Sequence, residues 1–312
     1  MSLTCGIDIG GTKIAAAVVD EEGTILERRR VDSPAEDPDA IEDLIVELVA
    51  DLGERHEIAA VGIGAAGYVD SARAVVMFAP NVAWRDADLR ARIEGRTGLD
   101  VVVENDANAA AWGEFIVGAG RDADDLLLVT VGTGVGGGIV ASGALYRGAF
   151  GVAAEIGHLR VVPDGELCGC GNRGCLEQYA SGRALVRRTH EEAADDPAAA
   201  ALLERAGGRV EDITGAMVTA AAQEHDPFAI ARLAELGRWL GEGIASLCTV
   251  LDPSVVVVGG GVSDAGELLL DPARKAFEAQ MVGKGHRPMV SIVPARLGND
   301  AGVIGAADLA RR

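Results

Sequence analysis

The feature that most constrains the fold is a strand–glycine turn–strand pattern that occurs twice in the 312 residues. Residues 5–20 contain two short β-rich runs joined at residues 10–12, and residues 126–141 repeat this pattern around residues 132–134. β-rich runs on both sides of a glycine turn predict a β-hairpin. Because the same unit occurs twice, we expect the chain to be built from two related halves.

Helical signals alternate with further strand signals. Asp37-Pro38 is a helix start, and apolar residues recur at helical spacing from Ile41 to Leu52. Strands are expected at 59–63 and 101–104. Strands interleaved with helices predict the α/β class, and the length allows two domains.

Charge and hydropathy exclude several classes of partner. The chain has 28 Lys and Arg against 48 Asp and Glu, a net charge of −20, so a phosphate backbone would be repelled. No apolar run approaches the roughly 18 residues of a membrane span, and the first ten residues lack the features of a signal peptide. We therefore expect a cytoplasmic protein without a nucleic-acid or membrane partner.

Three glycine-rich turns are candidates for binding phosphate, at residues 10–11, 132–138 and 259–261. Glycine lets backbone N–H groups approach an anion closely. The alternative is that the glycines serve only the conformation of the turns. Residues 132–137 match the dinucleotide-binding pattern, but a strand follows in place of the required helix, which argues against NAD. After the third turn, Ser263 is the expected N-cap of a helix.

One histidine and three cysteines form a candidate zinc site. His158, Cys168, Cys170 and Cys175 lie within eighteen residues in a glycine-dense segment. Three thiolates and one imidazole are the ligands of a closed, structural tetrahedral zinc site. The alternative is free thiols with a histidine that binds no metal.

Asp106 is the leading candidate for a general base. It follows the apolar run at 101–103, and open α/β sheets bind ligands at the ends of their strands. The alternative is that the polar residues here only cap a helix over 107–115. Glu155 and Glu177 lie close in sequence to the zinc ligands, so a folded zinc loop would bring both near one pocket.

Taken together, these motifs resemble the ROK family of sugar kinases and repressors. The resemblance covers nearly the whole chain. It rests on this ordered set: Asp8-Ile-Gly-Gly-Thr-Lys13, Gly62-x-Gly64-x-x-Gly67, Glu104-Asn-Asp-Ala-Asn108, Gly132-Thr-Gly-Val-Gly-Gly137, Glu155-x-x-His158, Cys168-x-Cys-Gly-x-x-Gly-Cys-x-Glu177 and Gly259-Gly-Gly-Val-Ser263. One departure is Ala66, where the family often has proline.

The resemblance implies the actin-like ATPase fold, a duplicated ribonuclease-H-like α/β unit with the active site in the cleft between two domains. The expected small domain comprises residues 1–112 and 302–312. The expected large domain comprises residues 113–301 and carries the zinc loop. ROK repressors have a DNA-binding module ahead of the kinase-like part, and we expect none here because the first hairpin starts by residue 6.

The resemblance also implies roles for particular residues. Asp106 would take the proton from the 6-hydroxyl of glucose as this oxygen attacks the γ-phosphate of ATP, with Mg²⁺ present. The sugar hydroxyls would be bound by Asn105, Glu155, His158 and Glu177, with Gly67 and Asn81 lining the same pocket. The phosphates would lie against Gly10, Gly11, Thr12, Lys13, Thr133 and Gly134, with Asp8 near Mg²⁺ and with Gly260 and Gly261 near the adenosine.

Two alternatives remain open at this point. The first is a kinase for another hexose, such as N-acetylmannosamine, fructose or mannose. The second is a sugar-sensing protein without catalytic activity. The resemblance further implies a homodimer or homotetramer.

Overall fold

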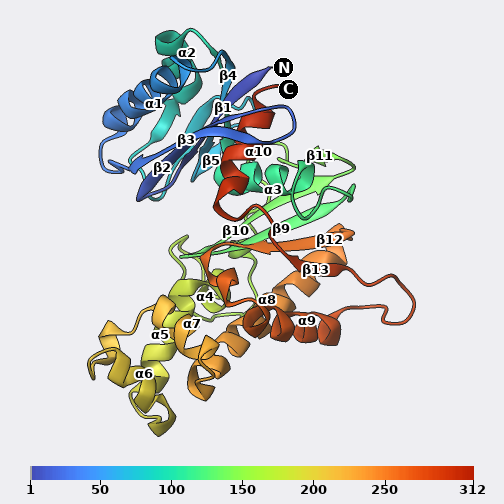
Figure 1. Ribbon diagram of the computed structural model, residues 1–312. Helices are drawn as coiled ribbons and strands as arrows, with labels where there is room; N and C mark the ends of the chain where they lie inside the picture. The colour runs from blue at the N-terminus through green and yellow to red at the C-terminus, as the bar shows by residue number, and fades with distance from the viewer. Residues whose placement is uncertain (1) are drawn as a thin grey trace. The chain divides into compact units, whose positions relative to one another are not determined.

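The computed structural model describes residues 2–312, which form two compact units (Figure 1). The first unit comprises residues 2–128, Gly137–Ala154 and Ala295–Arg312, and the second comprises Val129–Gly136 and Glu155–Pro294. The sequence-based domain limits placed 113–128, 137–154 and 295–301 with the large domain. The contacts place all three segments in the first unit.

The first sheet contains both strands of the N-terminal hairpin. Its order is β3-β2-β1-β4-β8, with β1–β2 and β2–β3 antiparallel and with β1–β4 and β4–β8 parallel. The five strands are β1 (Leu3–Ile9), β2 (Lys13–Val19), β3 (Ile25–Asp32), β4 (Ile58–Ala65) and β8 (Asp100–Asn105). A smaller antiparallel sheet consists of β5 (Tyr68–Val69), β6 (Val75–Phe78) and β7 (Arg85–Asp88).

The second large sheet has the same plan as the first. Its order is β11-β10-β9-β12-β13, so the opening strand of the second repeat is again central, between its hairpin partner and a later strand. Its strands are β9 (Leu126–Val131), β10 (Val135–Ala141), β11 (Ala144–Leu145), β12 (Val255–Gly259) and β13 (Ser291–Pro294). The predicted repeat is therefore confirmed by the matching strand orders.

Four helices belong to the first unit. They are α1 (Pro38–Gly53), α2 (Leu89–Thr97), α3 (Asp106–Ile116) and α10 (Ala301–Leu309). The predicted start of α1 is confirmed, because the Asp37 side chain accepts the N–H of Ala40. The apolar side of α1 packs into the core against the sheet, as the helical spacing of Ile41, Ile45, Leu48 and Leu52 predicts.

The second unit contains the other helices. They are α4 (Glu177–Ala180), α5 (Gly182–Ala193), α6 (Ala200–Arg205), α7 (Gly215–Gln223), α8 (Pro227–Leu251) and α9 (Glu267–Gln280), and α8 and α9 run side by side (Figure 1). Within residues 2–312 there are five short 3₁₀ turns. The second unit holds η1 (Ile156–His158), η2 (Pro197–Ala199), η3 (Val210–Asp212) and η4 (Gly261–Ala265), and the first unit holds η5 (Gly298–Asp300).

The expected helix cap at Ser263 is wrong. The backbone N–H and the hydroxyl of Ser263 both donate to the carbonyl of Gly260, which closes a 3₁₀ turn over Gly261–Ala265. The α-helix begins only at Glu267, after Gly266 with φ of +59°.

Glycines allow α10 to lie directly on the first sheet. A Cβ at Gly6 would be 1.9 Å from the carbonyl oxygen of Val303, and a Cβ at Gly62 would be 1.8 Å from that of Ala306. Gly6 and Gly62 are register partners on β1 and β4, so together they form one patch of the sheet without side chains.

Helix α3 approaches α10 equally closely. A Cβ at Gly305 would be 1.8 Å from the carbonyl oxygen of Ala109, and one at Gly113 would be 2.3 Å from that of Ala301. Both α3 and residues 295–300, which precede α10, belong to the first unit.

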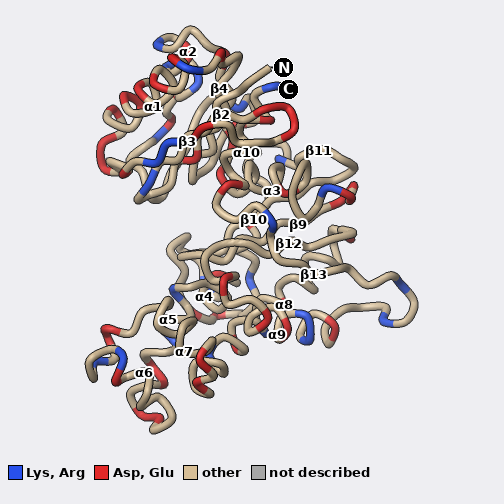
Figure 2. Tube along the Cα trace, in the orientation of Figure 1, with Lys and Arg blue, Asp and Glu red and all other residues tan. Residues whose placement is uncertain are grey.

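None of the helices within residues 2–312 is long and apolar enough to cross a membrane. Figure 2 shows acidic residues on elements of both units, with several along α1. The surplus of negative charge is therefore not confined to one unit.

The glycine patch under α10 predicts a position-dependent effect of one methyl group. Gly62→Ala should lower the free energy of unfolding by about 1–3 kcal/mol, because its Cβ meets a backbone carbonyl that cannot move independently. The matched substitution Gly95→Ala has open space on α2 and should stabilise by about 0.5–1 kcal/mol. Urea unfolding of both variants measures the difference, and equal effects would contradict this account of the contact.

Candidate active site

Asp106 lies where β8 ends and α3 begins. The side chain of Asn105 caps the helix, since its Oδ1 accepts the N–H of Asn108 at 3.0 Å. Capping therefore falls to Asn105, and Asp106 is the first residue of the helix. Burial raises the pKa of Asp106 above its usual range, and the N–H groups of Ala107 and of Asp106 itself oppose this shift. A carboxylate with a raised pKa is a better proton acceptor.

Asp8, on β1 of the first sheet, is a second partly buried carboxyl. The pKa of Asp8 is raised to about 7, first by burial and then by the charge of Asp106, while Arg30 opposes the rise. Two adjacent carboxyls repel each other when both are ionised. Oxygen donors of this kind suit Mg²⁺, which would relieve the repulsion.

The first glycine turn leaves two amides available. The N–H of Gly10 donates to the carbonyl of Lys13 at 3.0 Å, which closes the turn. The N–H groups of Gly11 and Thr12 donate to no group within residues 2–312. Lys13 is exposed and forms an ion pair with Asp32.

Gly67 and Asn81 border the same part of the first unit. The carbonyl of Gly67 accepts a hydrogen bond from Asn105 Nδ2 at 3.0 Å, which uses one of the two hydrogens of that amide. A Cβ at Gly67 would lie 2.4 Å from the Phe78 carbonyl oxygen, so only glycine fits there. Asn81 is exposed and packs beside Gly11, because a Cβ at Gly11 would lie 3.4 Å from that of Asn81.

The second glycine turn has the same pattern as the first. The N–H of Gly132 donates to the carbonyl of Gly134 at 3.0 Å, whereas the N–H groups of Thr133 and Gly134 donate to no group in the described part of the chain. Each repeat thus offers two consecutive amides that have no acceptor among the residues that the structure describes. Such amides are a physical basis for binding phosphate oxygens.

Val135 joins three motifs of the second unit. Its N–H donates to Glu177 Oε2 at 3.2 Å, and a Cβ at Gly157 would lie 2.2 Å from its carbonyl oxygen. Gly157 lies in η1 between Glu155 and His158. The structure therefore brings the second glycine turn, Glu177 and the Glu155–His158 turn together around one residue.

The third glycine turn lies beside the second. Gly260 has φ of +87°, and a Cβ there would lie 2.5 Å from the Val131 carbonyl oxygen at the end of β9. Gly261 has nothing within 4 Å of a Cβ position. Backbone at Gly260 and Gly261 is therefore close to the Thr133 turn, and Gly261 faces open space.

The four predicted zinc ligands converge. Their ligand atoms all lie within 4.8 Å of one another. Cys170 Sγ is 3.7 Å from Cys175 Sγ, and Cys168 Sγ is 3.7 Å from His158 Nδ1. Two sulfurs bound at about 2.3 Å to a tetrahedral zinc ion would be about 3.8 Å apart, so the donor set and its spacing fit zinc. With Nδ1 turned to the cysteines, Nε2 of His158 lies 4.0 Å from Glu155 Oε2.

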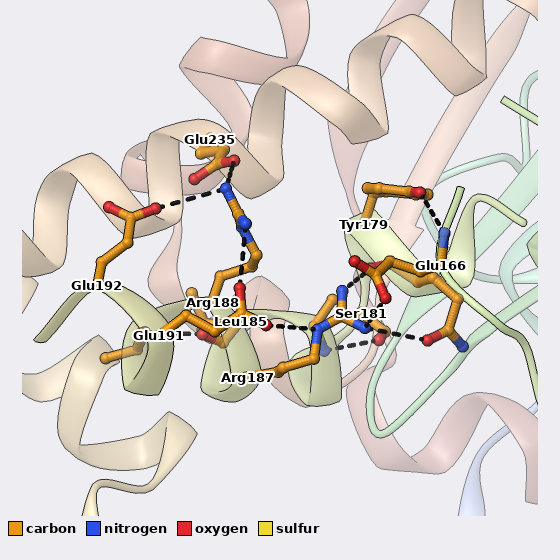
Figure 3. A network of polar contacts seen from close by, with 12 residues as sticks. Glu166, Tyr179, Ser181, Leu185, Arg187, Arg188, Glu191, Glu192 and Glu235 are labelled. Carbon is orange, nitrogen blue, oxygen red and sulfur yellow. Dashed lines mark hydrogen bonds and ion pairs between the residues drawn. The ribbon is translucent and has the colours of Figure 1, made fainter. Parts of the chain in front are cut away.

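A polar network connects the loop that carries the three cysteines to α4 and α5 (Figure 3). The Tyr179 hydroxyl accepts the N–H of Glu166 at 2.9 Å. Arg187 donates to the carbonyl of Gln178 at 2.7 Å and pairs with Glu166 at 3.6 Å. These bonds hold the loop beside Glu177, the first residue of α4.

Two arginines at the site were not predicted from the sequence. Arg85 donates to the carbonyls of Ala79 and Val82 and stacks over Phe78, which holds the loop that carries Asn81. Arg183 donates to the carbonyl of Thr133 at 3.2 Å and to Glu177 at 3.3 Å. Most of their partners are main-chain groups, which leave no pattern in the sequence.

The predicted residues thus form two groups, one in each unit. The first unit holds Asp8, the residues at 10–13, Gly67, Asn81, Asn105 and Asp106. The second unit holds Thr133, Gly134, Glu155, His158, Glu177, Gly260, Gly261 and the three cysteines.

Comparisons with known proteins cover the whole chain. It is 53 % identical to a glucokinase of Streptomyces coelicolor over 312 residues, 100 % of this chain and 98 % of the relative. A ROK family glucokinase from Streptomyces griseus, solved with glucose and AMPPNP, is 56 % identical with a TM-score of 0.90 and 99 % of each chain covered. A ROK hexokinase from Thermus thermophilus is 35 % identical with a TM-score of 0.81, over 99 % of this chain and 98 % of that one.

The ROK family profile matches residues 4–312. The repeated sheets and the similarity to solved ROK kinases identify the actin-like ATPase fold with two domains. The chain accordingly belongs to the ROK family.

Proposed function

We propose that this protein transfers the γ-phosphoryl group of ATP to the 6-hydroxyl of glucose, giving glucose 6-phosphate and ADP. The observation that carries this proposal is the full-length identity of 53–56 % with glucokinases, one of them solved with glucose and an ATP analogue. The partly buried Asp106 at the end of β8 supports it from the side of the chemistry.

Asp106 acts as the general base. The attacking oxygen of the sugar must lose its proton as the bond to phosphorus forms, and a carboxylate within hydrogen-bond reach accepts it. Asn105 fixes the backbone of Asp106 through the helix cap and through its bond to the Gly67 carbonyl.

The phosphates are bound by backbone amides. Gly11 and Thr12 in the first unit, and Thr133 and Gly134 in the second, supply N–H groups that point to no other acceptor in the described chain. Asp8 would hold Mg²⁺, directly or through water. When bound, this ion neutralises phosphate charge, which phosphoryl transfer requires.

The sugar hydroxyls are bound through hydrogen bonds to carboxylates, an amide and an imidazole. Glu177 and the Glu155–His158 turn surround Val135, and Asn105 retains one amide hydrogen for a sugar oxygen. Zinc at the cysteines would fix the His158 ring through Nδ1 and so leave Nε2 for the substrate.

Two further predictions belong to this proposal. The three zinc thiolates require a reducing compartment, so we place the protein in the cytoplasm. We also expect a homodimer or a homotetramer. A kinase for N-acetylmannosamine, fructose or mannose, or a sugar sensor, is the competing function.

A coupled assay of ADP release tests the function directly. Glucose with Mg²⁺ should stimulate ADP formation, and glucose should have the highest kcat/KM among the hexoses tested. Higher kcat/KM for another hexose would change the substrate. Sugar-induced thermal stabilisation without any sugar-dependent ADP would support the sensor instead.

The role of Asp106 predicts a loss confined to catalysis. Asp106→Asn should lower kcat by about 10²–10⁴-fold, because the amide cannot accept the proton. Glucose affinity, measured by calorimetry, should stay measurable. Asp43→Asn, at an exposed ion pair on α1, is the control and should retain activity. Full turnover by Asp106→Asn would exclude this residue as the base.

Metal analysis should find about one zinc ion per chain. Cys170→Ser should reduce the zinc content and weaken glucose binding, since Glu155, His158 and Glu177 flank the ligands. Cys248→Ala, at a buried cysteine outside the cluster, should retain zinc. Folded wild-type protein without zinc would remove the metal from the proposal.

A further inference from the structure

Glu104 precedes Asn105 and Asp106 at the end of β8, and its side chain is only 1 % exposed. A buried carboxylate is costly unless charges and hydrogen-bond donors surround it. Its Oε1 accepts the backbone N–H of Asn105 at 3.0 Å and an amide N–H of Asn108 at 3.1 Å. One oxygen of Glu104 is therefore bound to the start of the helix that presents Asp106.

The other oxygen of Glu104 faces two arginines. Arg147 Nε lies 2.8 Å from Oε2, and Arg73 Nε lies 3.5 Å from it. The Arg147 side chain is 11 % exposed. Opposite charges attract more strongly when they are shielded from water, so Arg147 is the main partner of this carboxylate.

Arg147 also holds the loop that follows Gly67. Its Nη1 donates to the Ser71 carbonyl at 3.0 Å, and its Nη2 donates to the Asp70 carbonyl at 2.8 Å. Gly151 has φ of +89°, and a Cβ there would lie 2.4 Å from the Val69 carbonyl oxygen. The segment after β11 is thus packed directly on the loop after Gly67.

Glu104 therefore links the start of α3 to the loop after Gly67 through Arg147. It binds the start of α3, it pairs with Arg147, and Arg147 binds residues 70–71. The hydrogen bond from Asn105 Nδ2 to the Gly67 carbonyl connects the start of α3 directly to the same loop.

We propose that the buried Glu104–Arg147 ion pair is a positioning device. It holds Asp106 at a fixed position relative to the loop that follows Gly67. The inference rests on the proposed function, in which Asp106 and this loop both meet glucose. Neither Glu104 nor Arg147 touches the reacting atoms. Their effect is geometric, and a misplacement of about 1 Å at a reacting group can cost about 10²-fold in rate.

Glu104→Gln is the first test, because glutamine keeps the size of the side chain and an oxygen acceptor while removing the charge. We expect kcat to fall about tenfold or more and the KM for glucose to rise, because Asp106 and the loop after Gly67 are no longer held in place by the ion pair. The KM for ATP should stay within about twofold, since the Gly11 and Thr12 amides are not bound to this pair. Unchanged kcat and KM for glucose would overturn the proposal.

A double variant separates positioning from stability. Arg147→Met leaves Glu104 buried without its main partner and should lower Tm. Adding Glu104→Gln removes that charge, so Tm should recover while kcat/KM for glucose stays low. Recovery of both Tm and kcat/KM would mean that the pair is only structural, and the proposal would fail.

Glu42→Gln is the matched control. Glu42 is also buried in the first unit, 6 % exposed, and its Oε1 lies 2.8 Å from Arg92 Nη1 between α1 and α2. This variant should lower Tm without changing kcat or the KM for glucose. A loss of kcat equal to that of Glu104→Gln would show a general effect of burial and would overturn the proposal.

Glucose affinity measured by calorimetry distinguishes the two levels of inference. If the wild type releases no ADP with glucose, the proposed function fails. Weaker glucose binding by Glu104→Gln than by Glu42→Gln would still support the positioning of the sugar loop. Equal affinities in these two variants would overturn it.

Discussion

The close approach of α10 to the first sheet governs much of the first unit. Gly6 and Gly62 leave a patch where the backbone of the last helix rests on β1 and β4. Helix α3 then packs on α10 with equally little space, at Gly113 and Gly305. Because α3 begins with Asp106, the placement of the proposed base depends on glycines that have no chemical role of their own.

The two units hold their site residues by different means. In the first unit, main-chain bonds and a buried ion pair connect Asn105, Glu104 and the loop after Gly67. In the second unit, Val135 contacts both Glu177 and the Glu155–His158 turn, and the cysteine cluster fixes the loop between them. A short loop with many glycines has little core of its own, so a metal ion is an effective way to order it.

The carboxyls of Asp8 and Asp106 lie in environments that lower the stability of the folded protein when both groups are ionised. Burial raises the pKa values of Asp8 and Asp106, and the two groups repel each other. Such groups are expected where a site must accept a proton or bind a cation. Glu104 differs from them, since two arginines and two N–H donors compensate its charge.

The sequence by itself determined the local elements. The two hairpins, the capped start of α1 and the grouping of His158 with the three cysteines follow from spacing and residue type, which encode contacts between near neighbours. It was wrong at Ser263, because both polar groups of that residue bond to the Gly260 carbonyl and close a tighter turn. The roles of individual sugar- and phosphate-binding residues stay predictions.

Only the tertiary structure decided which distant residues meet. Arg147 and Arg85 have no signal in the sequence, because their partners are main-chain carbonyls and a carboxylate brought together by the packing of separate segments. The contacts also place the second half of α3, residues 113–116, in the first unit with its first half, and α3 packs on α10 through glycines. A local sequence pattern indicates periodicity and the hydrogen bonds between residues that are near in sequence. Which distant segments approach each other closely is decided only when the whole core is packed.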